Sequence, residues 1–258
     1  MNSAGIIAIA NQKGGSGKTT TTLNLGVALG DLGYQVLLID LDPQASLTYS
    51  VGHQSEEGEA ERLYQQGELP VPIELEEEGV DMLSASLKLA SLELRLAQMP
   101  DREFILRAAV HQYRDQYDFI LMDCPPSLTL GTINALCAAD AVLIPVPLDV
   151  LSVKGLTVFL ETLESLRDSL HEDLVTLAAV PMMLDSRKNI TQELQDFLHQ
   201  LEGLPVTAGI RSDVKVAEAP SFGKSVIRYA PRSRASQDFL ALAKHTAAAM
   251  AEIELSTL

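Results

Sequence analysis

The chain changes character sharply within its first 32 residues. A continuous apolar run at 6–10 is followed by a loop that contains Gly14, Gly15 and Gly17, and then by a helical pattern over 18–32. Glycine accepts backbone conformations with positive φ that other residues rarely adopt, so this loop can turn tightly between the two elements. A buried strand that passes directly into a helix is the start of a β–α–β unit, and such units build parallel sheets.

Further segments of the same two kinds follow along the chain. Short apolar runs bounded by turn residues alternate with longer helical patterns, which is typical of a parallel sheet wrapped by helices. Strands are predicted at 6–10, 36–40, 80–84, 119–123, 141–146, 175–180 and 205–208, and helices at 18–32, 86–98, 102–116, 128–138, 150–169, 189–201 and 236–253. Most strand candidates are continuously apolar, which indicates that both faces of the sheet are covered. We predict an α/β fold: a three-layer sandwich with a mostly parallel twisted sheet flanked by helices, in a single domain over 1–258.

Composition excludes several classes of protein. Hydrophobic residues make up 47% of the chain and charged residues 21%, which is ordinary for a folded globular protein and argues against disorder. The first apolar run is too short for a signal peptide, and no stretch reaches the roughly 18 uncharged apolar residues that a membrane span needs. The chain's two cysteines, Cys124 and Cys137, cannot build a disulfide framework. The sequence therefore predicts a cytoplasmic protein.

Charge is distributed unevenly along a chain whose formal net charge is −16. Residues 52–81 are strongly acidic, with Arg62 as their only lysine or arginine, whereas residues 211–234 are rich in both. We expect the part at about 52–78 to be a solvated surface excursion and the acidic and basic segments to lie at different ends of the molecule. The net charge excludes a generally basic nucleic-acid coat, but a local basic face is compatible with it.

The glycine loop contains the residue types that bind phosphate. Its glycines let successive backbone N–H groups point inward at an anion, and the helix that begins near Lys18 adds the positive end of its dipole. Lys18 is predicted to neutralise the β and γ phosphates of a nucleotide, and the Thr19 hydroxyl to hold Mg²⁺. The predicted nucleotide contacts are Gly14, Gly15, Ser16, Gly17, Lys18, Thr19 and Thr20. This pattern predicts a P-loop NTPase.

Two predicted strands end in acidic residues. Asp40 and Asp42 follow the strand at 36–40, and Asp123 closes the strand at 119–123. The carboxyl ends of the strands line the ligand crevice of a doubly wound sheet, so these acids can converge on bound phosphates. Asp123 suits the role of a carboxylate that positions the water shell of the metal ion.

Four short segments together carry a family resemblance. Residues 13–20 (KGGSGKTT) resemble the deviant Walker A box of the ParA/MinD superfamily, residues 40–44 (DLDPQ) its second box, and residues 123–127 (DCPPS) its Walker B box. Residues 217–224 (AEAPSFGK) are similar to a segment typical of ParA and Soj partition ATPases. The resemblance implies that two subunits bind ATP face to face, and that Lys13 reaches the nucleotide of the partner subunit.

The resemblance also implies roles for further residues. Asp42 would orient the attacking water, Asp40 and Asp123 would serve the magnesium sphere, and Lys13 and Lys18 would stabilise the charge that develops on the transferred phosphoryl group. A homodimer formed with ATP would bind DNA without sequence preference and associate with the nucleoid. A ParB-like partner or another adaptor would stimulate hydrolysis. The predicted DNA-binding residues are Arg211, Lys215, Lys224, Arg228, Arg232 and Arg234.

The resemblance leaves several functions open. Partition of plasmid or chromosome DNA is one, and positioning of a protein cargo such as a carboxysome or a chemoreceptor cluster is another. A MinD-like membrane ATPase needs a basic amphipathic tail, but residues 250–258 are acidic and contain no lysine or arginine. An iron–sulfur carrier ATPase could use Cys124 and Cys137 from two subunits. We therefore predict no membrane partner and a DNA-partitioning ATPase.

Overall fold

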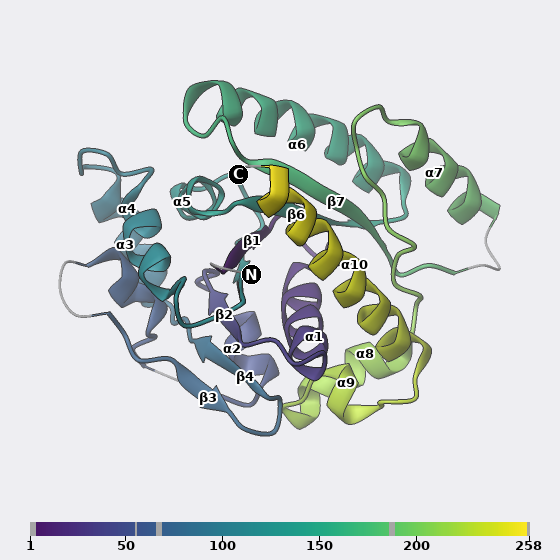
Figure 1. The fold of residues 1–258 in the computed structure, drawn as a ribbon, viewed down its shortest axis with the longest axis horizontal. Helices are drawn as coiled ribbons and strands as arrows, with labels where there is room; N and C mark the ends of the chain where they lie inside the picture. The colour runs from purple at the N-terminus through teal and green to yellow at the C-terminus, as the bar shows by residue number, and fades with distance from the viewer. Residues whose placement is uncertain (1–3, 55, 66–68, 186–188, 257–258) are drawn as a thin grey trace.

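The computed structural model describes residues 4–54, 56–65, 69–185 and 189–256. Among these residues, a seven-stranded sheet has the strand order β3-β4-β2-β5-β1-β6-β7 (Figure 1). The strands are β1 (Gly5–Ile9), β2 (Val36–Asp40), β3 (Ile73–Leu75), β4 (Val80–Leu83), β5 (Phe119–Asp123), β6 (Ala141–Pro147) and β7 (Val175–Met182). Only β3 pairs antiparallel with its neighbour, so the sheet is mostly parallel.

Helices cover both faces of the sheet (Figure 1). The α-helices are α1 (Lys18–Asp31), α2 (Ser46–Ser50), α3 (Lys88–Leu96), α4 (Ile105–Val110), α5 (Leu130–Ala138), α6 (Val150–Ser169), α7 (Asn189–Gln200), α8 (Val214–Glu218), α9 (Val226–Tyr229) and α10 (Arg234–Ser256). Three short 3-10 helices, η1 (Ala60–Tyr64), η2 (His111–Tyr113) and η3 (Ala219–Phe222), complete the described elements. The predicted three-layer α/β fold is confirmed.

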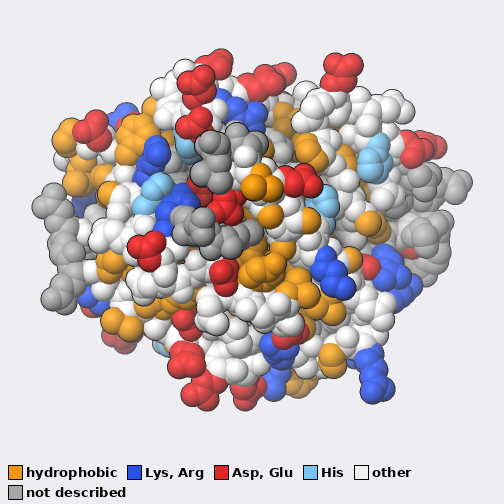
Figure 2. Space-filling model, in the orientation of Figure 1, with side chains coloured by type: hydrophobic (Ala, Val, Ile, Leu, Met, Phe, Trp, Pro, Cys, Tyr) orange, Lys and Arg blue, Asp and Glu red, His pale blue; other side chains and the backbone are white. Residues whose placement is uncertain are grey.

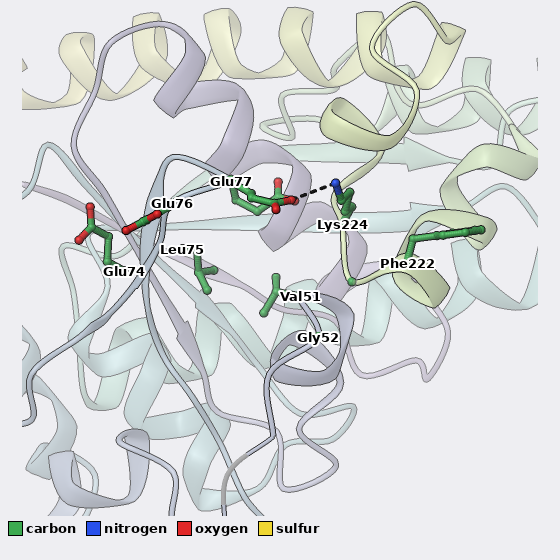
Figure 3. Close-up of a pocket in the computed structure, with 10 residues that line it drawn as sticks. Val51, Gly52, Glu74, Leu75, Glu76, Glu77, Phe222 and Lys224 are labelled. Atoms are coloured by element: carbon green, nitrogen blue, oxygen red, sulfur yellow. Dashed lines mark ion pairs between the residues drawn. The ribbon is translucent and has the colours of Figure 1, made fainter.

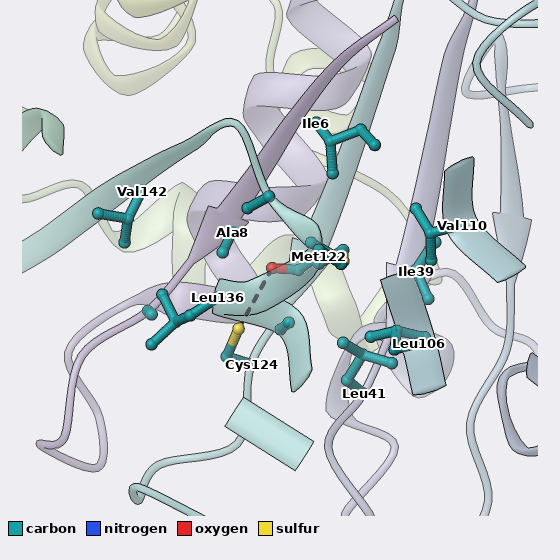
Figure 4. Packing of buried hydrophobic residues seen from close by; sticks show 14 of the residues in the cluster. Ile6, Ala8, Ile39, Leu41, Leu106, Val110, Met122, Cys124, Leu136 and Val142 are labelled. Carbon is teal, nitrogen blue, oxygen red and sulfur yellow. Dashed lines mark hydrogen bonds between the residues drawn. The ribbon is translucent and has the colours of Figure 1, made fainter. Parts of the chain in front are cut away.

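Two hydrophobic cores separate the layers. Along β1, Ile6 and Ala8 pack into one core with α3 to α7, whereas Ile7 and Ile9 pack into the other with α1, α9 and α10. Figure 4 shows the first core, in which Ile6, Ala8, Ile39, Met122 and Val142 come from neighbouring strands. Successive side chains of a strand point to opposite faces of the sheet. Because both faces are buried, the strands read in the sequence as continuous apolar runs.

Two of the expected elements differ in the structure. The expected strand at 205–208 forms only a single bridge, between Ala179 and Val206. The backbone turns at Gly209, which has a φ of 82°. As a result, it is Ile210 N–H that donates to Pro181 O, at 2.7 Å. The expected helix at 102–116 is shortened to α4 and η2.

The side chain of Asn134 on α5 determines where α4 begins. Its Nδ2 donates to Arg102 O at 2.7 Å, and its Oδ1 accepts from Leu106 N–H at 3.1 Å. Since a long-range side chain holds both backbone groups, the chain enters the helix only at Ile105. The local helical pattern could not reveal this contact.

The acidic stretch is more than a solvated excursion. Ala60, Leu63 and Tyr64 of η1 are buried in the first core, and β3 adds an antiparallel strand to the edge of the sheet. Glu61 is buried as well, and its Oε1 accepts a hydrogen bond of 2.9 Å from Ser86 N–H. The prediction of a surface excursion was therefore wrong for the segments that form η1 and β3.

The topology brings the predicted site residues to one edge of the sheet. The parallel register pairs Ile9 and Asp40 with Asp123, so β1, β2 and β5 end side by side. The loop that leaves β1 and the carboxylates that end β2 and β5 consequently lie at the same edge.

Candidate functional site

The loop at 10–17 connects β1 to α1 and is shaped by glycine. Gly15 and Gly17 have φ values of 69° and 94°, which are left-handed conformations that disfavour other residues. A Cβ atom at Gly17 would also lie 2.9 Å from Cε of Met182, so the methionine side chain would have to shift to admit it. Gly17 precedes α1, and the N-terminus of this helix has no side-chain cap. The first N–H groups of α1 can therefore point at an anion in the loop.

Lys18 and Ser16 are buried within this loop. The Lys18 ammonium group donates to Lys13 O at 3.3 Å, and burial lowers its pKa although the nearby Asp123 opposes this shift. The Ser16 hydroxyl is buried and has no hydrogen-bond partner among the described residues. A buried polar atom without a partner is costly in a folded protein. Both groups thus fit a loop that closes around phosphate oxygens.

Asp40 and Asp123 lie next to each other and are both fully buried. Burial raises the pKa of Asp40 to about 6, and burial followed by the charge of Asp40 raises the pKa of Asp123 well above its ordinary value. Two carboxylates in a low-dielectric region repel each other, so each disfavours ionisation of the other. A cation at this edge of the sheet would relieve the repulsion.

The two carboxylates differ in their hydrogen bonds. Asp40 accepts from the N–H and the hydroxyl of Thr48 at 2.9 and 2.7 Å, and from Asp42 N–H at 3.2 Å. Asp123 accepts a long 3.5 Å bond from the Thr22 hydroxyl, and its Oδ2 is buried without a hydrogen-bond partner among the described residues. Asp40 therefore holds the segment that carries Asp42 and α2, whereas Asp123 keeps an oxygen available.

The oxygen ligands present fit a magnesium ion. The Thr19 hydroxyl lies beside Asp123 and partly offsets the rise in its pKa. Mg²⁺ takes oxygen ligands, keeps several waters, and is usually bound through one or two carboxylates together with substrate phosphates. Within the described residues no group of three or more His, Cys, Asp or Glu side chains could hold a metal ion by itself. The arrangement suits a metal that arrives with a nucleotide.

Asp42 is buried at the start of the loop that follows β2. Its Oδ1 accepts from Gln44 N–H at 2.9 Å, which fixes the side chain in a turn, and its own N–H is held by Asp40. Asp42 therefore lies at the same edge as Asp40 and Asp123, as the strand ends predict. Its role in hydrolysis stays a prediction.

Lys13 is bound within its own chain. Its ammonium group donates to both oxygens of Asp149 at 3.0 and 2.8 Å and to the Ser152 hydroxyl at 2.7 Å. Asp149 caps α6 by accepting from Ser152 N–H. Burial tends to raise the pKa of Asp149, but the hydrogen bonds from Lys13 and Ser152 outweigh it and lower this pKa to about 2.

Sequence reasoning missed Asp149 and Thr48 as parts of the site. Asp149 stands directly before the predicted helix at 150–169, where an acidic N-cap is common, so its capping role could have been found. Its contact with Lys13 spans 136 residues and left no local signal. The bond between Thr48 and Asp40 also depends on how α2 folds back, which the sequence pattern does not indicate.

Most of the predicted DNA-binding residues are paired with acids. The pairs are Arg211 with Asp238 at 2.7 Å, Lys215 with Glu218 at 2.8 Å, Lys224 with Glu77 at 2.9 Å, and Arg228 with Asp31 at 2.7 Å. Arg232 and Arg234 are exposed and make no ion pair with the described part of the chain. The structure therefore distinguishes these last two residues from the other four.

The acidic and basic segments lie beside each other. Arg228 donates to the carbonyl oxygens of Glu77 and Glu78 at 2.9 Å, next to the pair between Lys224 and Glu77 (Figure 3). On the face drawn in Figure 2, acidic and basic side chains are interspersed. The expectation that the two segments occupy different ends of the molecule was wrong.

The two cysteines do not form a surface pair. Cys124 and Cys137 are both buried. Burial, and then the charge of Asp123, raises the pKa of Cys124, and burial raises the pKa of Cys137 to about 11. An iron–sulfur cluster between subunits needs exposed thiolates, so this arrangement disfavours the iron–sulfur alternative.

A strand that leads through a glycine loop into a helix, beside acids at the ends of two other strands, defines a P-loop nucleoside triphosphatase. Comparisons with known proteins agree. A protein family described as "AAA domain" matches residues 4–176. Sporulation initiation inhibitor protein Soj of Bacillus subtilis is 39% identical over 248 residues, covering 94% of this chain and 98% of Soj.

One further sequence relative and one solved structure are also similar to this chain. Chromosome-partitioning ATPase Soj of Thermus thermophilus is 39% identical over 248 residues, covering 95% of this chain and 96% of that protein. The solved structure of cobyrinic acid a,c-diamide synthase from Mycobacterium smegmatis with bound ADP and magnesium has a TM-score of 0.81 at 30% identity, with 93% of each chain covered. This chain belongs to the ParA and Soj family, and it is an ATPase. Within the described residues, every helix is too short or too polar to cross a bilayer.

The buried carboxylate of Asp123 leads to a prediction about stability without nucleotide. Because the fold raises the pKa of Asp123, the stability that the neutral form provides is present at low pH and is lost as pH rises through the raised value. Asp123→Asn removes the charge, so the variant should be more stable than the wild type by about 1–3 kcal/mol at pH 8. The gap should shrink at pH 5.

Urea denaturation at both pH values, with a chelator and no nucleotide, measures this difference. The exposed Asp173 provides a control, because Asp173→Asn makes the same change in charge at the surface. A variant Asp123→Asn that is less stable than the wild type at pH 8 would contradict the account of the buried pair.

Proposed function

We propose that two copies of this chain clasp two ATP molecules between them, bind DNA as a dimer, and separate after hydrolysis to drive partition of plasmid or chromosome DNA. ATP and magnesium are the cofactors of this ATPase. The observation that carries the proposal is the position of Lys13, a second lysine at the mouth of a loop that already contains Lys18. We propose that the chain acts as one domain over 1–258.

The loop would bind the phosphates of the nucleotide, and residues at the strand ends would contribute to the magnesium site. Backbone N–H groups of Gly14 to Thr20 would bind the phosphates, with Lys18 neutralising their charge. Magnesium, when bound, would offset the negative charge of the phosphates. Thr19 and Asp123 would supply the oxygens that fit it. Asp40 is predicted to serve the same sphere, and its bonds to Thr48 and Asp42 support a role in holding that segment in place.

Asp42 would orient the water that attacks the γ phosphate. An aspartate carboxylate is a weak base, so positioning describes its role better than proton abstraction. Slow turnover is the expected result. A slow enzyme suits a dimer that must persist until a ParB-like partner or another adaptor stimulates hydrolysis.

Lys13 would leave Asp149 when the dimer forms. Its side chain is about one-third exposed in the single chain, and the pair with Asp149 is partly solvated. Such pairs contribute only about 0–1 kcal/mol. The phosphates of a nucleotide on the partner subunit carry more charge than one carboxylate, so they can compete for the ammonium group. The bond to Asp149 would hold Lys13 ready until then.

Arg232 and Arg234 would lead the contacts with DNA. A dimer doubles the number of cations that meet the phosphate backbone, and each contact releases counterions. Arg211, Lys215, Lys224 and Arg228 remain predicted contacts, but their ion pairs must open first. We see no base-reading motif, so binding should be independent of sequence. The protein would then be cytoplasmic and associated with the nucleoid.

Two substitutions separate dimer formation from hydrolysis. Lys13→Gln should abolish ATP-dependent dimerisation and DNA binding, because the contact across the interface is lost. Asp42→Ala should keep both and lose turnover, because only the water is misplaced. Sedimentation with ATP, DNA binding with ATP or ADP, and phosphate release measure the three properties. Equal DNA affinity with ADP and ATP would contradict the switch.

Asp149→Asn should strengthen the dimer. The amide keeps the cap on α6, because asparagine caps helices as well as aspartate does. It no longer carries the charge that holds Lys13. Since two pairs open per dimer at up to about 1 kcal/mol each, the dimer dissociation constant should fall by about 2- to 30-fold. Analytical ultracentrifugation with a non-cleavable ATP analogue measures this constant, and a weaker dimer would count against the proposed release.

Arg234→Ala should reduce both the affinity for DNA and its dependence on salt. Loss of one phosphate contact per subunit lowers the slope of log affinity against log salt by about one unit for each contact. Arg95 on α3 is also exposed and serves as a control, since Arg95→Ala removes the same charge from another surface. Equal effects of the two substitutions would indicate a general effect of charge and no defined face.

A further inference from the structure

A groove separates the β3–β4 hairpin from the segment between η3 and α9. It has a volume of about 520 Å³ and is lined by Val51, Gly52, Glu74, Leu75, Glu76, Glu77, Glu78, Phe222, Gly223 and Lys224. We call this surface the hairpin groove (Figure 3). It lies outside the nucleotide site, and none of the functions described above uses its acidic residues.

The hairpin groove is strongly acidic. Four of its lining residues are acidic, Glu74, Glu76, Glu77 and Glu78, and one is basic, Lys224. Lys224 pairs with Glu77 at 2.9 Å, which leaves Glu74 and Glu76 exposed to solvent without an ion pair to the described residues. The hydrogen bond that Lys224 donates to Glu77 raises the pKa of Lys224, so this ammonium group stays charged. The groove therefore repels anions and attracts cations.

The groove also has an apolar part. Phe222 is 62% exposed, and its ring stacks on Tyr229 with centroids 4.9 Å apart, which holds the aromatic surface in place. Val51 and Leu75 are partly buried in the lining. Arginine and lysine have apolar stems that pack on such surfaces while their charged ends reach polar groups. A lining that combines acidic and apolar residues matches that kind of side chain.

Glu78 provides an independent sign that the groove is incomplete. Its side chain is only 3% exposed, and its Oε1 accepts from Ser225 N–H at 3.0 Å. Its Oε2 is buried and has no partner among the described residues. A buried carboxylate oxygen without a donor costs free energy, and a cationic donor entering the groove would satisfy it. Ordinary surface acids do not show this feature.

We propose that the hairpin groove binds an extended segment of a protein partner that presents arginine or lysine side chains. β3 is the outermost strand in the sheet order, and an outer strand can pair with an added extended segment through its backbone. Nucleic acids and anionic membranes carry phosphates, which four carboxylates would repel. The carboxylates of the groove are not among the residues assigned to ATP, magnesium or DNA, whereas Lys224, which pairs with Glu77, is also a predicted DNA contact.

Binding would compete with Lys224. An arginine that approaches Glu77 must displace the lysine from its ion pair, since both cations seek the same carboxylate. Substitution of Lys224 should therefore strengthen binding of the basic segment. A substitution that merely disrupted the surface would weaken it. Removal of Glu74 and Glu76 should weaken binding.

Fluorescence anisotropy with a short labelled peptide, in which arginine alternates with valine, tests the proposal. Glu74→Gln combined with Glu76→Gln should weaken binding by about five-fold or more. The control combines Glu172→Gln with Asp173→Asn, which removes two exposed charges elsewhere and should change the affinity by less than about two-fold. Lys224→Ala should bind more tightly than both the wild type and Lys244→Ala, which removes an exposed lysine on α10.

Three results would overturn the proposal. The first is that the variant with both Glu74→Gln and Glu76→Gln binds the peptide as tightly as the wild type. The second is that this variant and its control lose the same amount of peptide affinity, because equal losses would indicate attraction by overall charge. The third is weaker peptide binding by Lys224→Ala. None of these three results would contradict the proposed nucleotide and DNA functions, because ATP turnover and DNA binding are measured in separate experiments.

Discussion

The parallel pairing of β1 with β5 and β6 is the constraint on which the rest of the structure depends. Burial of both faces of β1 fixes the strand in the middle of the sheet, so the loop that leaves it must emerge at the carboxyl edge. The same register pairs Asp40 with Asp123. The fold thus concentrates negative charge beside a loop built to bind anions, and a cation between the two resolves the conflict.

Intramolecular ion pairs hold most of the cations that the proposed function uses. Lys13 is bound by Asp149, and four cations between 211 and 228 are bound by acids from α1, β3–β4, α8 and α10. Exposed pairs of this kind are weak, so a multivalent anion such as a triphosphate or a DNA backbone can compete for them. A chain with a net charge of −16 can in this way keep its cations ordered without a permanently basic surface.

The hairpin groove lies close to the element that follows Asp42. Val51 and Gly52 come directly after α2, and Gly52 packs so closely on Gly223 that a Cβ atom at Gly223 would lie 3.2 Å from Cα of Gly52. Thr48 of α2 is held by Asp40. One short helix therefore lies between the nucleotide site and the groove, and it contacts η3 on its way.

The order of most strands and helices, the glycine loop and the three acids at the strand ends followed from the sequence, because buried parallel strands are continuously apolar and glycine, lysine and threonine have distinct local signatures. Prediction failed where one distant side chain or turn decided the outcome, as Asn134 did for the start of α4 and Gly209 for the strand at 205–208. Tertiary structure alone placed Lys13 on Asp149 and the acidic stretch beside the basic one. Such contacts join residues more than 100 positions apart. The sequence does not indicate whether a charged side chain is solvated or forms an ion pair with a distant residue.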